Sequence, residues 1–488
     1  MRWAVVLLLF ASAQAQQECA TCHAAIARSY RTTPMANTSG PAASNNSPIQ
    51  QASFTSPGGG AHYSVGKDPH GFFFDFRQEA IEGRRTLDYF VGSGLIGRSF
   101  LTSIDGFLFQ APVAYYSVPA KWGLSPGYER SEEINLLREA EPSCLSCHGV
   151  KDGGVTCIRC HGPGHEHVAR MRSGKHSAGS GIVNPSKLEP ARRDSVCAQC
   201  HLPGAVSIAR TNSPYTPGAR LSDSLAIFVW NGMETTVNGH FEQLARSACY
   251  RASQGKLWCG TCHQAHGQTA SFKTACLRCH AGLEHVKANL KADCLGCHMP
   301  RRPAVTVEHA ALTDHSIPRK PRDQALRPGS ELALFGGEPA GDRELGLAYA
   351  TLALQDANRT WGLRAFELLK SVPEDAKVDA QLGQLYDRMG QSRNACNLYA
   401  RAVAIDPNAT AAALNLGTCR AAEGKLAESI ALWTGVLARN PGLESARLNL
   451  AVAQVRNGDP AAARVTLREA LRFNPASSKA LDLQRELK

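Results

Sequence analysis

Seven copies of the pattern Cys-x-x-Cys-His are the residues of this sequence most able to do chemistry. Two thiols at this spacing can add to the two vinyl groups of one haem, and the histidine that follows then lies under the iron as its proximal ligand. The pattern therefore predicts seven covalently bound haem c groups. The predicted thiol anchors are Cys19, Cys22, Cys144, Cys147, Cys157, Cys160, Cys197, Cys200, Cys259, Cys262, Cys276, Cys279, Cys294 and Cys297, and the predicted proximal ligands are His23, His148, His161, His201, His263, His280 and His298.

Three other uses of paired cysteines explain the pattern less well. Structural zinc sites use Cys-x-x-Cys pairs but do not need a histidine directly after each second cysteine. Thioredoxin-like redox pairs need a βαβ context and do not recur along a chain in this way. Disulfides fit an exported protein, yet they leave the seven histidines unexplained. Haem attachment accounts for both residue types.

Ten histidines remain outside the motifs, enough to give each iron a second imidazole. Six of them stand out by local sequence, because they follow a haem motif or lie beside turn-forming Gly and Pro residues. His266 comes only three residues after the motif histidine His263, too near to fold back onto the same iron, and would ligate a neighbouring one. The six candidate distal ligands are His62, His167, His240, His266, His309 and His315.

Met35 is a candidate ligand of another kind, because a thioether can ligate haem iron and raises its potential. It lies twelve residues after His23, beyond a helix-like stretch over residues 24–31. Alternatively, Met35 only covers the edge of the haem. His70 and His176 lie in polar stretches and are expected to face solvent.

The motifs lie close together along the chain. Cys144 and Cys157 are 13 residues apart, and Cys259, Cys276 and Cys294 follow at intervals of 17 and 18 residues. Such short connections would hold neighbouring haems near one another, so that electrons can pass from iron to iron. With roughly 43 residues for each haem over residues 16–318, the haems would form much of the apolar interior.

The elements that position these motifs are expected to be mainly helical. We predict a haem-packed cytochrome domain over residues 16–318, with few strands and a small β-containing insertion at about 62–118. In that insertion, Asp105-Gly106 between two apolar runs predicts a hairpin with a type I′ turn. The preceding residues 37–60 are rich in Ser, Asn, Pro and Gly and predict a long loop.

The last third of the chain shows a period of 34 residues, with a Leu-Gly or Leu-Ala pair early in each unit and a proline near its end. This is the tetratricopeptide pattern, in which each unit is a helical hairpin and stacked units form a solenoid. The predicted units are 376–409, 410–443 and 444–477, preceded by a degenerate unit at 342–375 and a linker at 319–341. Cys396 and Cys419 fall on neighbouring helices of this α-solenoid, where a disulfide can form outside the cell.

The N-terminus predicts export. A basic start, an apolar run over residues 4–10 and the triplet Ala13-Gln14-Ala15 form a signal peptide over residues 1–15. This run is too short to span a membrane and no second apolar run follows, so the mature protein is expected to be soluble and periplasmic or otherwise exported. The net charge of +11 invites a nucleic-acid partner, but it is better explained as balance for the propionates of the haems.

Taken together, these motifs resemble those of exported multihaem c-type cytochromes fused to tetratricopeptide repeats. The resemblance is carried by the seven motifs, by the tail of the first motif at residues 29–36, and by the segments 89–94, 124–128 and 313–315. It implies that the six candidate histidines named above are distal ligands. Many relatives carry a histidine near the position that Met35 occupies in this chain. The resemblance therefore implies that the ligation of the first haem differs from that in those relatives.

The haem region is also similar to the wider group of nitrifier electron-transfer cytochromes and pentahaem nitrite reductases. The reductases bind substrate at a site with lysine in place of the proximal histidine, and no Cys-x-x-Cys-Lys occurs in this sequence. We therefore expect electron transfer along the haems, to or from a redox partner protein, with a protein or peptide held by the repeats. The alternatives are an oxidoreductase acting on a small nitrogen or sulfur compound at one open-coordinate haem, and a haem-bearing sensor or assembly scaffold.

Overall fold

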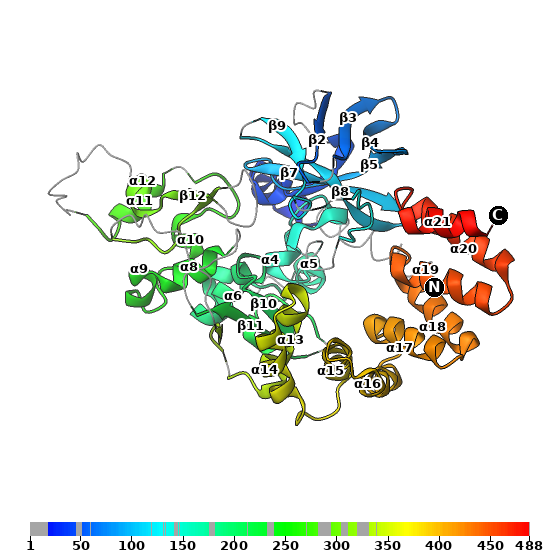
Figure 1. Ribbon diagram of the computed structural model, residues 1–488. Coiled ribbons are helices and arrows are strands. Elements are labelled where there is room, and N and C mark those ends of the chain that lie inside the picture. Colours follow the sequence, from blue (N-terminus) through cyan, green and yellow to red (C-terminus); the bar gives the residue numbers. More distant parts are fainter. Residues whose placement is uncertain are drawn as a thin grey trace.

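The computed structural model describes residues 18–44, 51–140, 145, 147–174, 181–231, 239–281, 294–303, 311–319 and 331–487, except the single residues 59, 119, 130, 132, 212, 270 and 338. After the short helix α2 come the strands of two sheets, then further short helices, and an arc of paired helices ends the chain (Figure 1). The predicted signal peptide, Cys144, His309 and part of the predicted linker lie outside the described residues. Within the described part of the chain, no helix is both long and apolar enough to cross a membrane.

Residues 39–124 form two antiparallel sheets that share one hydrophobic core. Along β4 the burial alternates: Phe72, Phe74 and Phe76 are buried on one face as a two-residue period requires, whereas Phe73 and Asp75 between them are only partly buried. The first sheet contains β1 (Ser39–Pro41), β6 (Tyr89–Val91), β7 (Gly97–Ile104), β8 (Phe107–Tyr116) and β9 (Lys121–Leu124). The second contains β2 (Ala52–Thr55), β3 (His62–Asp68), β4 (Gly71–Gln78) and β5 (Ile81–Leu87).

The predicted hairpin is confirmed. Strands β7 and β8 pair antiparallel, with Ile104 opposite Phe107 across a two-residue turn. Asp105 and Gly106 in that turn have φ values of +53° and +83°, as a type I′ turn requires.

The β structure is larger than expected. The strands begin at β1 and β2, inside the segment predicted as a loop, and they continue beyond residue 118 to β9. Strands β1 and β2 have weak intrinsic propensity, but each pairs with a neighbouring strand that supplies its backbone hydrogen bonds. A three-stranded sheet of β10 (Val206–Ala209), β11 (Leu225–Trp230) and β14 (Leu332–Leu334) and a two-stranded sheet of β12 (Arg301–Pro303) and β13 (Ala311–Thr313) add further strands. The N-terminal region is thus less helical than the predicted mainly α fold.

Short helices lie on the motifs and between them, from the first motif onward. The longest of these short helices in the described part of the chain is α6, which has twelve residues. They are α2 (Ala24–Tyr30), α4 (Ile158–His161), α5 (His165–Arg172), α6 (Pro190–His201), α7 (Leu221–Ser224), α8 (His240–Arg246), α9 (Ala248–Ala252), α10 (Cys259–Cys262), α11 (Phe272–Leu277) and α12 (Cys294–His298).

The C-terminal helices stack as antiparallel pairs. In two of these pairs, a glycine on the first helix lets a ring of the second approach closely: a Cβ atom at Gly383 would lie 2.5 Å from Tyr399, and one at Gly417 would lie 2.5 Å from Trp433. This close approach explains the repeated Leu-Gly of the sequence. The helices are α13 (Asp342–Asp356), α14 (Arg359–Leu369), α15 (Ala376–Arg388), α16 (Ser392–Ile405), α17 (Thr410–Ala422), α18 (Leu426–Arg439), α19 (Glu444–Arg456), α20 (Pro460–Phe473) and α21 (Ser478–Glu486).

The first helix pair of this arc packs on the three-stranded sheet. Ala348 of α13 is fully buried against Ala226 and Phe228 of β11. The rings of Trp230 and Trp361 lie 5.1 Å apart, which joins the end of β11 to α14. The start of the arc is therefore fixed to the middle of the chain.

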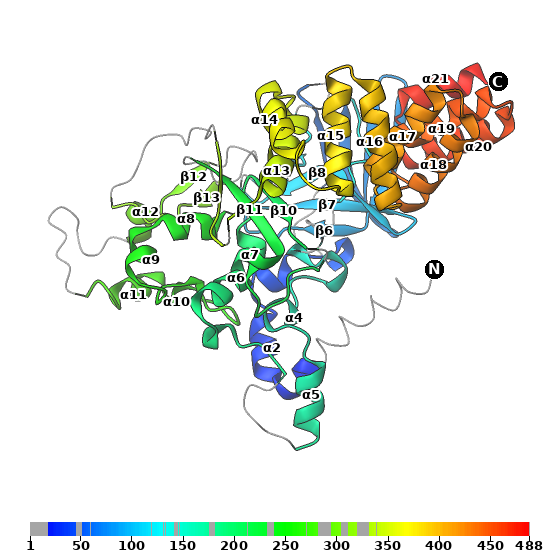
Figure 2. The ribbon, with the colours of Figure 1, turned by 90° about the horizontal axis from the view of Figure 1, so that it is seen from below.

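The last helix pair returns to the N-terminal sheets (Figures 1 and 2). Phe473, at the end of α20, is 1% exposed and meets Phe109 of β8 edge-to-face with ring centres 6.1 Å apart. Arg85 donates to the carbonyl oxygen of Arg472 at 2.6 Å, and Arg472 forms an ion pair with Asp105 in the hairpin turn. The arc is thus attached at both ends.

Cys396 and Cys419 form a disulfide between α16 and α17, as the sequence allowed. Because the bond closes a loop of 23 residues, reducing it is expected to lower the free energy of unfolding of the repeats by about 3 kcal/mol. Urea unfolding followed by tryptophan fluorescence, with and without reductant, measures the loss. A Cys396→Ser/Cys419→Ser variant should have the same free energy of unfolding as the reduced protein, and adding reductant should not change it. Equal stability in both conditions would contradict the prediction.

Candidate functional site

Each described motif is built as a single helical turn. The amide of the motif histidine donates to the carbonyl oxygen of the first cysteine, at 2.9 Å in the Cys19 motif and 3.0 Å in the Cys157 motif. The same bond recurs at His263 and His280. Because residues three and four apart share one face of a helix, this turn places both thiols and the imidazole on the same side. The local fold therefore presents the three groups together.

Thiols of different motifs meet in space. Cys19 is in hydrogen-bond contact with Cys157, Cys147 with Cys200, and Cys197 with Cys259. The neighbouring thiol is the main cause that raises the pKa of Cys200, followed by burial. The first motif thus adjoins the third, and the fourth adjoins both the second and the fifth.

Two predicted distal histidines face motif histidines. The rings of His161 and His266 are nearly parallel, with centres 5.7 Å apart and an angle of 13° between their planes. His263 and His315 lie 6.3 Å apart at 21°. In both pairs, one ring belongs to a motif and the other to a segment far from it along the chain.

A third pair is in direct contact. His201 and His240 have ring centres 5.1 Å apart, and their Nδ1 atoms are 3.0 Å apart. His240 also lies 4.7 Å from His315, so that His201, His240, His315 and His263 form a continuous row of imidazoles.

Backbone carbonyl groups fix the orientation of three imidazoles. Nδ1 of His161 lies 2.7 Å from the carbonyl oxygen of Val183, and Nδ1 of His298 lies 2.9 Å from that of Pro318. His315 makes the same contact with Thr313 at 2.9 Å. A ring whose Nδ1–H donates to a carbonyl keeps an unprotonated Nε2, which is the atom that ligates a metal.

Burial favours the neutral form of the four imidazoles in the row of His201, His240, His315 and His263. It lowers the pKa of His240 to about 3, with further lowering by the neighbouring His315 and His201. Burial is likewise the main cause of the lowered pKa of His201, His263 and His315. Neutral rings with free nitrogen lone pairs are what metal ligation requires at neutral pH.

The spacing of the rings can be compared with the space an iron needs. A metal–nitrogen bond of about 2 Å on each side, plus about 1 Å from each nitrogen to its ring centre, gives about 6 Å between two ligating rings. The ring-centre distances of His161 with His266 and of His263 with His315 lie close to this value, whereas the distance between His201 and His240 is about 1 Å shorter. Among the described residues, no three His, Cys, Asp or Glu side chains converge to hold a bare metal ion. A haem iron differs, because it takes only one or two protein ligands.

The remaining candidate ligands lie apart from these pairs. His62 is on β3, with its Nδ1 3.3 Å from the hydroxyl of Thr55, and no motif residue is among its partners in the described chain. His167 is on α5, and its Nδ1 is buried without a hydrogen-bond partner among the described residues. Met35 lies in a 3₁₀ turn, and its backbone carbonyl accepts a hydrogen bond from the amide of Val155. Val155 is in the segment between the second and third motifs.

Two residues that support the imidazoles were not singled out from the sequence. Tyr30 packs edge-on against His266 at 6.4 Å and donates to the carbonyl oxygen of Val155 at 2.6 Å. Gln243 accepts a hydrogen bond from the amide of His315 at 2.6 Å. Tyr30 lies within the segment after the first motif that carried the family resemblance, which was the available indication of its role.

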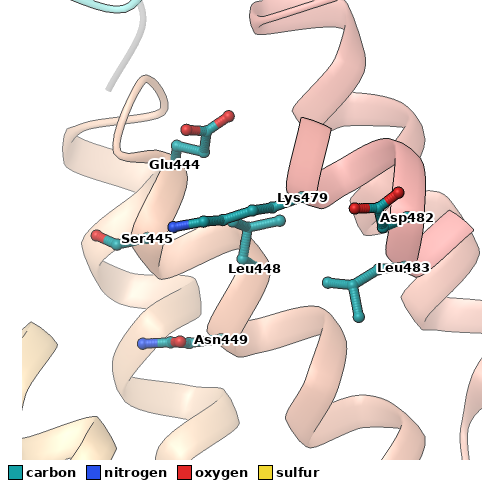
Figure 3. A pocket seen from close by; sticks show the side chains of 7 residues that line it. All are labelled: Glu444, Ser445, Leu448, Asn449, Lys479, Asp482 and Leu483. Carbon is teal, nitrogen blue, oxygen red and sulfur yellow. The ribbon is translucent and has the colours of Figure 1, made fainter. Parts of the chain in front are cut away.

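The repeats contain a pocket of about 500 Å³ between α19 and α21 (Figure 3). Two leucines form its apolar part, and charged and amide groups of both helices surround them. The lining residues are Glu444, Ser445, Leu448, Asn449, Lys479, Asp482 and Leu483. Such a mixed surface suits a peptide segment better than a small polar metabolite.

Comparison with known proteins concerns the repeats. Sequence models of the tetratricopeptide repeat match residues 380–409 and 420–487. No curated protein matches the chain.

Several solved structures are similar to part of the chain. YrrB, a tetratricopeptide protein with an unusual peptide-binding site, is 23% identical with a TM-score of 0.25, over 30% of this chain and 73% of its own. Pseudomonas aeruginosa PilF is 18% identical with a TM-score of 0.26, over 30% of this chain and 67% of its own. MamA of MSR-1 is 23% identical with a TM-score of 0.27, over 30% of this chain and 82% of its own. From the matched sequence models and the stacked helix pairs, the C-terminal region is a helical solenoid of tetratricopeptide repeats.

Proposed function

We propose that this protein is an extracytoplasmic multihaem c-type cytochrome that transfers electrons to or from a partner held by its repeats. The observation that carries the proposal is the two pairs of nearly parallel imidazoles, His161 with His266 and His263 with His315, whose ring centres are separated by about the distance expected for two ligands of one iron. When bound, haem iron accepts and donates single electrons. The chain's own residues would anchor the porphyrins through the motif thiols, fix the imidazole orientation and exclude water.

Two features fit the extracytoplasmic location in this proposal. The signal peptide predicted at residues 1–15 and the disulfide between Cys396 and Cys419 are both typical of proteins in an oxidising compartment. The described motif cysteines are all free thiols, available for thioether bonds.

The contacts between motif thiols suggest how the haems would be ordered. The first and third sites adjoin, and the fourth adjoins the second through Cys200 and the fifth through Cys197. Cys262 of the fifth site lies beside Cys276 of the sixth. The proposed path therefore does not follow the order of the motifs along the chain, and the fourth site lies at its centre.

The repeats would hold the partner. Tetratricopeptide solenoids bind proteins and peptides on their concave side. The pocket between α19 and α21 offers Leu448 and Leu483 to an apolar side chain, and Asn449 to a peptide backbone (Figure 3).

The alternative function is catalysis on a small nitrogen or sulfur compound at a haem with an open position. His23 and His280 favour it, because both are exposed and neither faces another imidazole among the described residues. The first and sixth sites are therefore the places where a substrate could reach an iron.

Two measurements test the proposal and separate it from the alternative. Mass spectrometry of the exported protein should show seven covalently attached haems, and a chain without added haem mass would contradict the proposal. In the second measurement, nitrite, hydroxylamine or sulfite is added to the reduced protein. An unchanged absorption spectrum supports electron transfer alone, whereas a ligand-dependent shift supports the catalytic alternative.

A further inference from the structure

Asp314, the residue before His315, carries a buried carboxylate that two side chains bind. The residue is 7% exposed. Its Oδ1 accepts hydrogen bonds from the amide and the hydroxyl of Ser316, which closes a turn around His315. Its Oδ2 lies 3.0 Å from Nη2 of Arg302, whose side chain is 15% exposed. Both charges of this ion pair are therefore largely withdrawn from solvent.

Arg302 belongs to β12, the strand that follows the seventh motif. Strand β12 pairs with β13, and next to the last pair of the two strands the amide of Asp314 donates to the carbonyl oxygen of Pro300 at 3.0 Å. The side chain and the backbone of Asp314 are thus both bound to the segment that follows the seventh motif. This double attachment anchors the residue that precedes His315.

The position of His315 is important because its ring faces the motif histidine of the fifth site. The rings of His315 and His263 have centres 6.3 Å apart and an angle of 21° between their planes. The amide of His315 donates to Gln243 at 2.6 Å, and its Nδ1 lies 2.9 Å from the carbonyl oxygen of Thr313. Since these contacts start from the backbone on either side of Asp314, a change of the backbone there would move the ring relative to His263.

These contacts lead to an inference that rests on the proposed function. We propose that Asp314 is a positioning residue for the fifth site. Its ion pair and its hydrogen bonds hold the backbone of His315 so that this imidazole ligates the fifth haem iron opposite His263. Groups that hold a metal ligand from behind set its orientation and the strength of its bond to the metal. The carboxylate acts in this way through the backbone that carries the imidazole.

The test uses Asp314→Asn in the full-length, haem-loaded protein. The amide keeps an oxygen for the hydrogen bonds of Ser316 but has no charge to pair with Arg302. Electron paramagnetic resonance of the oxidised protein counts low-spin and high-spin haems, since a ferric haem with two imidazoles is low spin and one that loses an imidazole becomes high spin. Asp314→Asn is expected to convert one of the seven predicted haems to high spin. His315→Ala, which removes the imidazole itself, should give the same conversion.

Asp379→Asn in the repeats is the matched control. Asp379 is 1% exposed, and its carboxylate accepts two hydrogen bonds from Arg401, both at 2.6 Å. The control therefore also breaks the pairing of a buried carboxylate with an arginine, but in a part of the chain without haem motifs. It is expected to lower stability and to leave the number of high-spin haems as in the wild type.

A second variant covers the case in which Asp314→Asn does not accumulate. That substitution leaves the charge of Arg302 buried without its partner, which is strongly unfavourable. The double variant Arg302→Met/Asp314→Asn removes both charges and replaces the single variant. It should show the same conversion of one haem, and a wild-type spectrum of the loaded double variant would overturn the role of Asp314.

The outcomes separate this inference from the proposed function. A wild-type protein without covalent haem overturns both. If His315→Ala leaves the spin states of a haem-loaded protein unchanged, His315 is not a ligand and this inference alone is wrong. A wild-type spectrum of haem-loaded Asp314→Asn likewise overturns only the role of Asp314, as does an equal conversion in Asp379→Asn.

Discussion

A Cys197→Ala/Cys200→Ala variant is expected to carry six covalent haems instead of seven and to be reduced in two separate kinetic phases. The reason is the position of the fourth motif, whose thiols contact Cys147 of the second motif and Cys259 of the fifth. Removal of the fourth site would therefore separate the fifth and sixth sites from the second site. Mass spectrometry counts the haems, and stopped-flow mixing with a reductant followed by haem absorbance gives the phases.

The matched control is Cys276→Ala/Cys279→Ala, which removes the sixth site. This motif adjoins the fifth through Cys276, and its Cys279 is exposed, so the site lies toward the edge of the proposed path. The control should also lose one haem but should still be reduced in a single phase. Single-phase reduction in both variants would contradict the central position of the fourth site.

Phe473→Ala is expected to lower the free energy of unfolding by about 3–5 kcal/mol, the usual loss for a fully buried phenylalanine. The ring is 1% exposed, packs on Phe109 and lies beneath the guanidinium groups of Arg447 and Arg472. Its removal would leave a cavity at the contact between the last repeat and the hairpin turn. Urea unfolding measures the loss, and limited proteolysis should cut the last repeats faster than in the wild type.

Val465→Ala is the matched control on the same helix. Val465 is 51% exposed, so its truncation should change the free energy of unfolding by no more than about 0.5 kcal/mol. If Phe473→Ala were no more destabilising than Val465→Ala, the proposed contribution of this contact to stability would be wrong.

Local patterns predicted the parts of the fold that depend on local geometry. The 34-residue period located the helical hairpins, because Gly383 and Gly417 must admit the rings of Tyr399 and Trp433. The Asp105-Gly106 turn was predictable for the same kind of reason, since its two positive φ values select those residues.

Pairings between distant segments were not predictable in this way. Strand β11 pairs with β14, so that Phe228 lies opposite Leu334, although β14 falls within the segment predicted as a linker. Strand β1 pairs with β6 although its own residues favour a loop. Hydrogen bonds supplied by a distant strand outweigh the propensity of a short segment.

The same distinction between local geometry and contacts of distant segments applies to the candidate site. Each motif predicts its own anchors and proximal ligand, because the spacing of the cysteines and the histidine within one turn determines their arrangement. His161 and His266 are more than a hundred positions apart in the sequence, and their rings come together only through the packing of the whole middle region.

The attachment of the repeat arc at both ends has a mechanical consequence. A solenoid that is held at one end can change its curvature freely when a ligand binds. Here α13 is fixed to β11, while Phe473 and Arg472 are fixed to Phe109 and Asp105. Any partner that tightens or widens the arc must therefore exert a force on one of these two contacts, and the hairpin of β7 and β8 would bear part of that load directly.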